Sequence, residues 1–349
     1  MNVFTMARSK INIVFTSPFI FKLKSFINAD LREKMPIKLI CVSHTPLLDF
    51  ASPPAEIEAA ARATFQKLAE QVKAYDPTLI VVFGPDHFNG FFYDLMPSFC
   101  VGVRATAAGD WNYGPAPLDV PEDKALGLIE HCLDHDIDIS YSYRMQADHG
   151  FTQPLDLLCE GQLNRYPVIP VFINGAAAPM PRTKRVIELG KVIGAYLKTL
   201  DERVLIIGSG GLSHDPPTPQ ISTAAPEVQE FLIAGRNPTA EARENRQSKV
   251  IAVGQRLASG DLSAALPLNP EWDKDLLQRF KNADFDYLAN MSNDEIRRDG
   301  GRGGQEIRAW IAAFAALSAS GEYNSEVHYY EPIQEWIAGM GMMTAQPKA

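Results

Sequence analysis

The sequence predicts an α/β fold with a central sheet, mostly parallel or mixed, covered by helices on both faces, and a helical C-terminal part. Three observations predict this class. Short apolar runs recur without polar alternation, which is typical of strands buried on both faces. Amphipathic stretches separate the runs, with apolar residues three and four apart, as on one face of a helix. After Pro226 the pattern is mostly helical to about Ser320.

The predicted elements follow one another from Ile37. Ile37–Val42 is a continuous apolar run and is predicted to be the first strand. A helix follows over Pro54–Tyr75, where apolar residues recur at helical spacing: Ile57, Ala61, Phe65, Leu68 and Val72. The other strands are predicted at Thr78–Phe83, Ser98–Val103, Val168–Ile173 and Val204–Ile207. Helices are predicted between them at Pro121–His135 and Thr183–Leu200. Strands that alternate with helices build a sheet with helical layers on both sides.

Composition limits the classes of function. The chain has 349 residues, 46% of them apolar, which is enough for a large core. Its formal net charge is −9, which argues against a nucleic-acid partner because such binding needs a basic face. Four scattered cysteines form neither a CxxC pair nor a disulfide framework, so a reducing, cytoplasmic location is expected.

The charge is unevenly distributed along the chain. Residues 1–36 carry a net charge of +4, so the remainder carries −13. The apolar stretch Ile11–Leu23 is shorter than the ~20 residues that a membrane-spanning helix needs, so no membrane partner is predicted. We expect residues 1–34 to be a leader that is disordered or lies upstream of the true start, and residues 35–349 to form a single catalytic domain.

Histidines indicate where the chemistry lies. Four of the seven stand beside turn residues at the ends of apolar segments: His44, His87, His149 and His214. Binding sites of open α/β sheets collect at the carboxyl ends of strands, so these four are predicted to share one site. His131 and His135 are four residues apart but lack an HExxH glutamate, and a solvated helix end is predicted there. His328, in a strand-like run, is predicted to be structural.

Two glycine-rich runs accompany these histidines. Gly208–Gly211 follows a strand without a GK[ST] or GxGxxG signature, so it is predicted to turn the backbone sharply and aim His214 inward. Gly300–Gly304 precedes a helix and is either a mobile surface loop or a hinge beside the site. Ser209 and Ser213 lie near His214, but no GxSxG elbow supports a serine hydrolase.

Several longer segments resemble the class III extradiol ring-cleavage dioxygenases, relatives of protocatechuate 4,5-dioxygenase. The match runs from Met35 to about Gly341 and consists of motifs in the same order: SHTPLL, FGPDHFNGFFYDLMPSFC, QADHGFTQPL, PVFING, GSGGLSHDPP, LNPEWD, EIRAWIAAFAALSA and YYEPIQEWIAGMG. The resemblance implies one non-haem Fe(II), O2 as co-substrate and a homo-oligomer of four or more subunits. It further implies a 3-substituted catechol substrate with a propionate or cinnamate side chain.

The resemblance also implies individual roles. His44 and His87 match the family's imidazole ligands, and Glu306 matches the carboxylate ligand of the iron. If Glu306 is not the third ligand, Asp86 is the next carboxylate to consider. His149 matches the proton donor and His214 the proton acceptor. A cationic partner for the side-chain carboxylate stays open among four arginines: Arg144, Arg182, Arg297 and Arg302.

Two other classes of function are compatible with the same histidines. A metal-dependent hydrolase could use them with Zn2+, and O2 dependence would separate it from a dioxygenase. A binding module that kept only the fold should have lost some of the four site histidines, yet all four are present.

Overall fold

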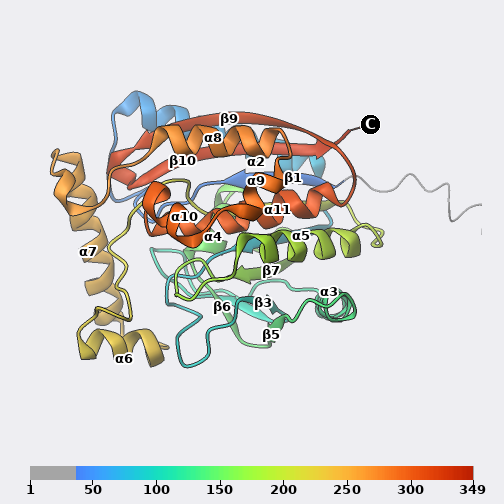
Figure 1. The fold of residues 1–349 in the computed structure, drawn as a ribbon, viewed down its shortest axis with the longest axis horizontal. Coiled ribbons are helices and arrows are strands. Elements are labelled where there is room, and N and C mark those ends of the chain that lie inside the picture. Colours follow the sequence, from blue (N-terminus) through green and yellow to red (C-terminus); the bar gives the residue numbers. More distant parts are fainter. Residues whose placement is uncertain (1–36, 349) are drawn as a thin grey trace, which may run out of the picture. The chain divides into compact units, whose positions relative to one another are not determined.

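The computed structural model describes residues 37–348 and holds an eight-stranded sheet between two layers of helices (Figure 1). The sheet order is β5-β3-β7-β2-β8-β1-β10-β9. The strands of the parallel centre are β7 (Val168–Ile173), β2 (Leu79–Gly84), β8 (Val204–Ser209) and β1 (Lys38–Val42). The prediction for residues 1–34 lies outside the described residues.

Antiparallel pairing flanks this parallel centre on both sides, so the sheet is mixed. β3 (Phe99–Gly102) runs antiparallel to β7 and carries β5 (Ser140–Ser142) at one edge. β10 (Ala338–Pro347) runs antiparallel to β1 and pairs with β9 (Tyr323–Ile333) at the other edge. A separate two-stranded sheet joins β4 (Ala105–Ala107) to β6 (Met145–Ala147).

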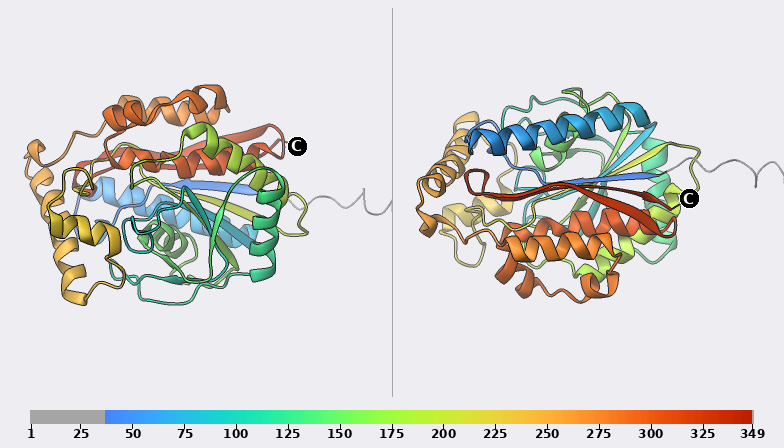
Figure 2. Two further views of the ribbon diagram at one scale, coloured as in Figure 1. Left: turned by 60° about the horizontal axis from the view of Figure 1, so that its bottom comes forward. Right: turned by 90° about the horizontal axis from the view of Figure 1, so that it is seen from above.

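Alternation along the central strands builds a core on each face of the sheet. In β1, Leu39 and Cys41 pack into one apolar cluster, whereas Ile40 and Val42 pack into the other. One face is covered by α2 (Ala55–Tyr75) and α4 (His149–Leu158), and the opposite face by α3 (Glu122–Asp134), α5 (Thr183–Leu197), α8 (Pro270–Lys281) and α11 (Ile307–Ser318) (Figure 2). The predicted sheet with helices on both faces is confirmed.

The predicted helical C-terminal part is also confirmed, and it ends in the β9–β10 hairpin. Its further helices are α6 (Pro226–Ala234), α7 (Ala240–Ala258), α9 (Phe285–Asn290) and α10 (Asn293–Gly300), with short 3-10 turns η1 (Leu262–Ala264), η2 (Gly303–Glu306) and η3 (Gln334–Trp336). Local sequence sets their starts: Ser292 and Glu295 form a capping box at α10, and Asn269 caps α8. α6 and α7 lie at the end of the sheet where β1, β2 and β8 finish (Figure 1).

Several smaller predictions can be compared with the described residues. All four cysteines are buried and free of disulfides. His131 and His135 lie at the end of α3, and His328 lies in β9, where its Nε2 is 2.7 Å from Thr344 Oγ1. Within residues 37–348, no helix combines the length and apolar character needed to cross a bilayer.

Candidate active site

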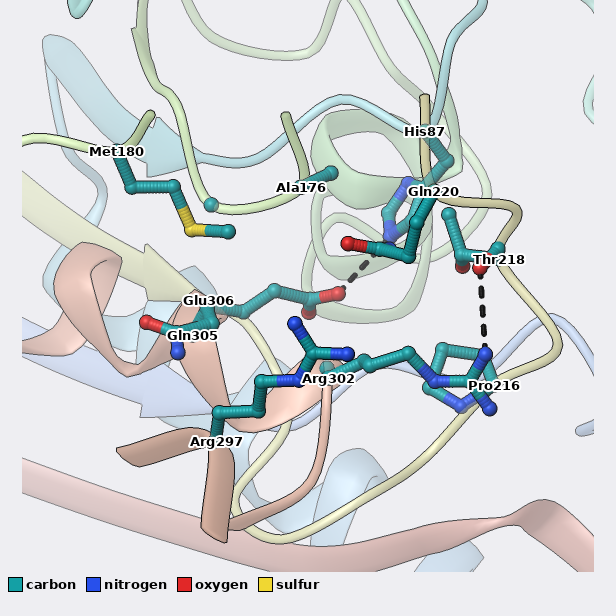
Figure 3. Close-up of a pocket in the computed structure, with 12 residues that line it drawn as sticks. His87, Ala176, Met180, Pro216, Thr218, Gln220, Arg297, Arg302, Gln305 and Glu306 are labelled. Atoms are coloured by element: carbon teal, nitrogen blue, oxygen red, sulfur yellow. Dashed lines mark hydrogen bonds and ion pairs between the residues drawn. The ribbon is translucent and has the colours of Figure 1, made fainter. Parts of the chain in front are cut away.

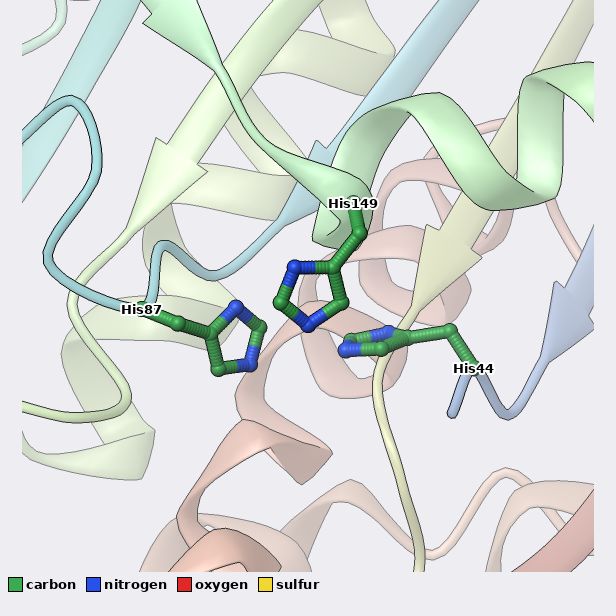
Figure 4. Close-up of side chains that lie close together, drawn as sticks. All are labelled: His44, His87 and His149. Carbon is green, nitrogen blue, oxygen red and sulfur yellow. The ribbon is translucent and has the colours of Figure 1, made fainter. Parts of the chain in front are cut away.

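The fold brings the four predicted histidines and Glu306 together at the carboxyl ends of the parallel strands. His44 follows β1, His87 follows β2 and His214 follows β8, as the pattern predicts. His149 is the first residue of α4, because the Asp148 side chain accepts a hydrogen bond from Gly150 N and caps that helix. Ligand atoms of His44, His87 and His149 all lie within 4.8 Å of one another (Figure 4).

Glu306 is the carboxylate on which the rings converge. Its Oε1 lies 3.1 Å from His87 Nε2 and 3.2 Å from His214 Nε2, and its Oε2 lies 3.5 Å from His44 Nε2. Gly211 N donates to the same Oε2 at 3.1 Å. The carboxylate stands at the end of η2, immediately before the buried helix α11, so its position is fixed by the core.

The Nδ1 atoms of His44 and His214, the ring nitrogens that do not face Glu306, each contact a neutral oxygen acceptor. Ser209 Oγ donates to Gly150 O at 2.5 Å, so its oxygen accepts from His44 Nδ1 at 3.0 Å. His214 Nδ1 donates to Leu212 O at 3.0 Å, since a carbonyl can only accept. Both rings therefore carry a proton on Nδ1 and turn Nε2 toward Glu306.

The Nδ1 atoms of His87 and His149 each contact a carboxylate. His87 Nδ1 lies 3.0 Å from Asp148 Oδ2, which also accepts from the amide of Asn89 at 3.0 Å. His149 Nδ1 lies 2.6 Å from Asp110 Oδ2, with both side chains buried. A carboxylate that accepts from Nδ1 of an imidazole fixes the orientation of the ring.

Burial and neighbouring charge set the ionisation of the cluster in the metal-free protein. Burial lowers the pKa of His44 to about 3 in spite of Glu306, so this ring is neutral. Burial also disfavours the charged form of His87 and His214, but nearby carboxylates outweigh it. Asp148 and Glu306 raise the pKa of His87, and Glu306 raises the pKa of His214. For Glu306, burial is outweighed by His214 and His44, which hold its pKa well below the usual range.

Both glycine-rich runs pack directly against the site. A Cβ on Gly211 would lie 2.4 Å from His214 Nδ1, and a Cβ on Gly303 would lie 2.0 Å from His214 Nε2. Gly301, at φ 78°, lets the chain pass over the backbone of His214. The interpretation of Gly300–Gly304 as a mobile surface loop is therefore wrong, because most of this run is buried beside the site.

The donor set fits a divalent transition metal. Neutral imidazole nitrogens and one carboxylate on a single side leave positions open for other ligands, as in two-histidine, one-carboxylate iron sites. Octahedral ligand atoms at about 2.1 Å from an ion lie roughly 3 Å apart, close to the distances between Glu306 and His87 or His44. The alternative ligand Asp86 is occupied elsewhere, since its carboxylate accepts from the backbone amides of Asn89, Gly90 and Phe91.

A cavity of about 540 Å³ opens onto the cluster. All four histidines and Glu306 line it, together with the apolar side chains of Trp111, Phe231 and Leu232. Helices α6 and α7 contribute much of its wall, including Arg243 and Arg246. An apolar chamber with a few polar groups at one end suits a small aromatic ligand.

Four functional candidates are absent from the sequence-based prediction: Asp110, Asp148, Arg243 and Arg246. Asp148 could have been suspected because it directly precedes His149. The other three have no periodic or spacing signal, since tertiary packing alone brings them to the site. Of the four arginines predicted for the substrate carboxylate, Arg297 and Arg302 line a smaller cavity beside His87 and Glu306 (Figure 3), whereas Arg144 and Arg182 line neither cavity.

Residues 38–341 match the family described as the catalytic LigB subunit of aromatic ring-opening dioxygenase. The chain belongs to this family and is an enzyme of the ring-cleaving dioxygenase class. Curated relatives carry the name 2,3-dihydroxyphenylpropionate/2,3-dihydroxicinnamic acid 1,2-dioxygenase. The protein from Photorhabdus laumondii is 60% identical over 313 residues, covering 90% of this chain and 98% of that protein. Those from Paraburkholderia phymatum and Rhodococcus rhodochrous are 50% and 46% identical, over 89% and 88% of this chain and 98% and 97% of the relatives.

Proposed function

We propose that this enzyme uses Fe(II) and O2 to open the ring of a 3-substituted catechol beside, rather than between, its two hydroxyls. The substrates are 3-(2,3-dihydroxyphenyl)propionate and 2,3-dihydroxycinnamate, which the names of the relatives support. The assembly is a homo-oligomer of four or more subunits in the cytoplasm, with residues 35–349 as the catalytic domain. Light scattering on the purified protein tests the subunit number.

One observation carries the metal assignment. His44 and His87 turn their Nε2 atoms to opposite oxygens of the buried Glu306 carboxylate, at 3.5 and 3.1 Å. His44 is neutral and can bind a metal without losing a proton, while Asp148 orients His87 from behind. His44, His87 and Glu306 would therefore hold the ion, and Fe(II), when bound, supplies the redox chemistry that joins the catechol to O2.

The remaining two histidines handle protons. His214 accepts a proton from a catechol hydroxyl, since it lines the cavity and its Nδ1 is tied to Leu212 O, which leaves Nε2 for the exchange. His149 donates a proton during ring opening, with its ring held in place by Asp110 Oδ2, 2.6 Å from Nδ1. Both atoms of O2 enter the ring-opened product, so the reaction needs no further reductant.

The test loads the protein with Fe(II) without oxygen and then adds O2 and a panel of 3-substituted catechols. We expect O2 consumption and a yellow ring-fission product, with the propionate and cinnamate compounds as the best substrates. Protein loaded with Zn2+ is the control and should consume no O2. Absence of O2 uptake with every catechol, or turnover with Zn2+ in the absence of O2, would overturn the proposal.

A further inference from the structure

Two arginines of α7 face the cavity beside the histidine cluster. Arg243 and Arg246 are three residues apart, so they lie on the same face of the helix. Both line the cavity that also contains the four histidines and Glu306. The two guanidinium groups place positive charge at this end of a largely apolar chamber. The other charged side chains that line it outside the cluster are Asp110, Glu227 and Lys249.

Neither guanidinium forms an ion pair with a carboxylate within residues 37–348; Asp110, Asp86 and Asp148 act on Arg246 only from a distance. Arg243 Nη1 donates to the carbonyls of Ala108 at 2.8 Å and Gly109 at 2.6 Å. Arg246 donates to Phe88 O at 3.2 Å and Asn89 Oδ1 at 3.3 Å, and its Nε is buried without a partner. A partly buried charge with only neutral acceptors is costly unless an anion completes the site.

Short chains of contacts connect these arginines to the reacting centre. Arg246 binds Asn89, whose amide donates to Asp148 Oδ2, which in turn holds His87 Nδ1. Arg243 binds the carbonyl of Gly109, next to the Asp110 that holds His149. The guanidinium groups are therefore separated from the proposed metal ligands by only one or two intervening residues. This separation suits a substrate whose carboxylate is on a short side chain of the ring.

The cavity wall also suits such a side chain. The Phe231 ring lies 4.5 Å from the Arg246 guanidinium, so a cation–π contact holds the arginine in place. Phe231 lines the cavity as well and offers an apolar surface for methylene groups.

The arginines of the smaller cavity are poorer candidates. Arg302 is already neutralised by Asp215, with Nε to Oδ1 at 2.7 Å and Nη2 to Oδ2 at 2.9 Å. Arg297 is exposed, and the cavity that it lines holds only about 30 Å³, room for a water molecule or two. A propionate group does not fit there.

We propose that Arg246, assisted by Arg243, binds the side-chain carboxylate of the substrate and sets the preference for acidic catechols. This inference rests on the proposed function. The guanidinium of Arg246 has five N–H donors, more than Phe88 O and Asn89 Oδ1 occupy, so it can also donate to the oxygens of a carboxylate. The catechol hydroxyls then lie toward the cluster and the carboxylate toward α7.

The test compares two catechols of similar shape, 3-(2,3-dihydroxyphenyl)propionate and the uncharged 3-propylcatechol. We expect Arg246→Met to lower kcat/KM for the propionate by about 10- to 100-fold, through KM, and to change kcat/KM for 3-propylcatechol by less than about twofold. Arg243→Met should have the same selectivity with a smaller loss, and Arg246→Lys should recover part of it. The matched control is Arg256→Met on the same helix, an exposed residue paired with Asp261 at 2.8 Å.

An equal loss of kcat/KM for both catechols would overturn the inference, because it would mean that Arg246 only stabilises the position of α7. Loss of the preference in Arg297→Met instead of Arg246→Met would overturn it too. A second readout needs no turnover: calorimetric binding of 3-phenylpropionate to the metal-free protein should weaken about 10-fold or more in Arg246→Met. If the unmodified enzyme cleaves neither catechol, the proposed function fails, and the binding comparison still decides the role of Arg246.

Discussion

Asp110 and Asp148 are buried residues of the same type that hold different rings of one cluster. Asp148 accepts from His87, a proposed metal ligand, whereas Asp110 accepts from His149, the proposed proton donor. We expect Asp148→Asn to lower iron affinity by about 10- to 100-fold, because the orientation and basicity of a metal ligand depend on such a partner. Asp110→Asn should keep iron and lower kcat by a similar factor.

Iron content after dialysis and single-turnover rates with saturating Fe(II) measure the two effects separately. Each variant is the control for the other, since both replace a buried carboxylate by an isosteric amide. Equal iron affinity in the two variants would contradict the division of the histidines into ligands and proton carriers.

Direct substitution of the histidines tests the same division. We expect His44→Ala and Glu306→Ala to lose bound iron, whereas His149→Ala and His214→Ala should keep iron and lose about 10²- to 10⁴-fold in turnover. Anaerobic titration with catechol then separates the last two, because His214→Ala should impair formation of the catecholate and His149→Ala should not. Normal catecholate binding by His214→Ala together with failure of His149→Ala would reverse the two roles.

Site residues could be predicted from the sequence only where the position of a residue in the chain indicates its position in space. The histidines after β1, β2 and β8 were predictable because parallel strands all end at one edge of the sheet. Asp110 stands in a loop and Arg246 in the middle of a polar helix, where nothing local marks a residue that faces the site. Their roles come from packing between segments that are far apart in the chain.

Helices α5 and α11 approach each other closely because small residues meet at their contact. Gly190 and Gly194 of α5 face Ala312 and Ala316 of α11, and a Cβ on Gly194 would lie 2.0 Å from Ala316 O. α11 begins directly after Glu306, so this contact also fixes the carboxylate. The stretch EIRAWIAAFAALSA is alanine-rich where the two helices touch.

We expect Gly194→Ala to lower the free energy of unfolding by about 1–3 kcal/mol, although alanine favours helices, because the backbone of α11 cannot give way. Urea unfolding monitored by circular dichroism measures this change. Gly114→Ala is the control, since its Cβ would meet nothing within 4 Å, and it should be nearly neutral. Equal stability of the two variants would show that the contact between α5 and α11 relaxes.

Elements with a strong local signal were predictable, and those defined by their partners were not. The central strands are runs of valine, isoleucine and leucine buried on both faces, and they match their predicted ranges within a few residues. β10 reads AGMGMMTAQP, with two glycines and few β-branched residues, and becomes a strand by pairing with β1 and β9. β4 and β6 are three residues each and exist only as a pair.

Because of the histidine cluster, the stability of the whole molecule and its affinity for the metal both depend on pH. In the metal-free protein the raised pKa values of His87 and His214 keep protons beside the Glu306 carboxylate. Histidines of this kind stabilise the fold below the unfolded pKa of about 6.5, and that contribution is lost as the pH rises through their folded pKa values. A metal bound to Glu306 neutralises the charge that retains these protons, so metal affinity should rise with pH.

We therefore expect Fe(II), added without oxygen, to raise the melting temperature more at about pH 8 than at about pH 6. Free metal at 100-fold above Kd adds about 2.7 kcal/mol of stability. Thermal unfolding with and without Fe(II) at both pH values measures the difference. Glu306→Gln is the comparison variant: it keeps the shape of the side chain but lacks the charge, so it should show a small Fe(II) effect at either pH. An equal Fe(II) effect at the two pH values in the unmodified protein would mean that the metal displaces no protons, and would rule out its placement between His87 and Glu306.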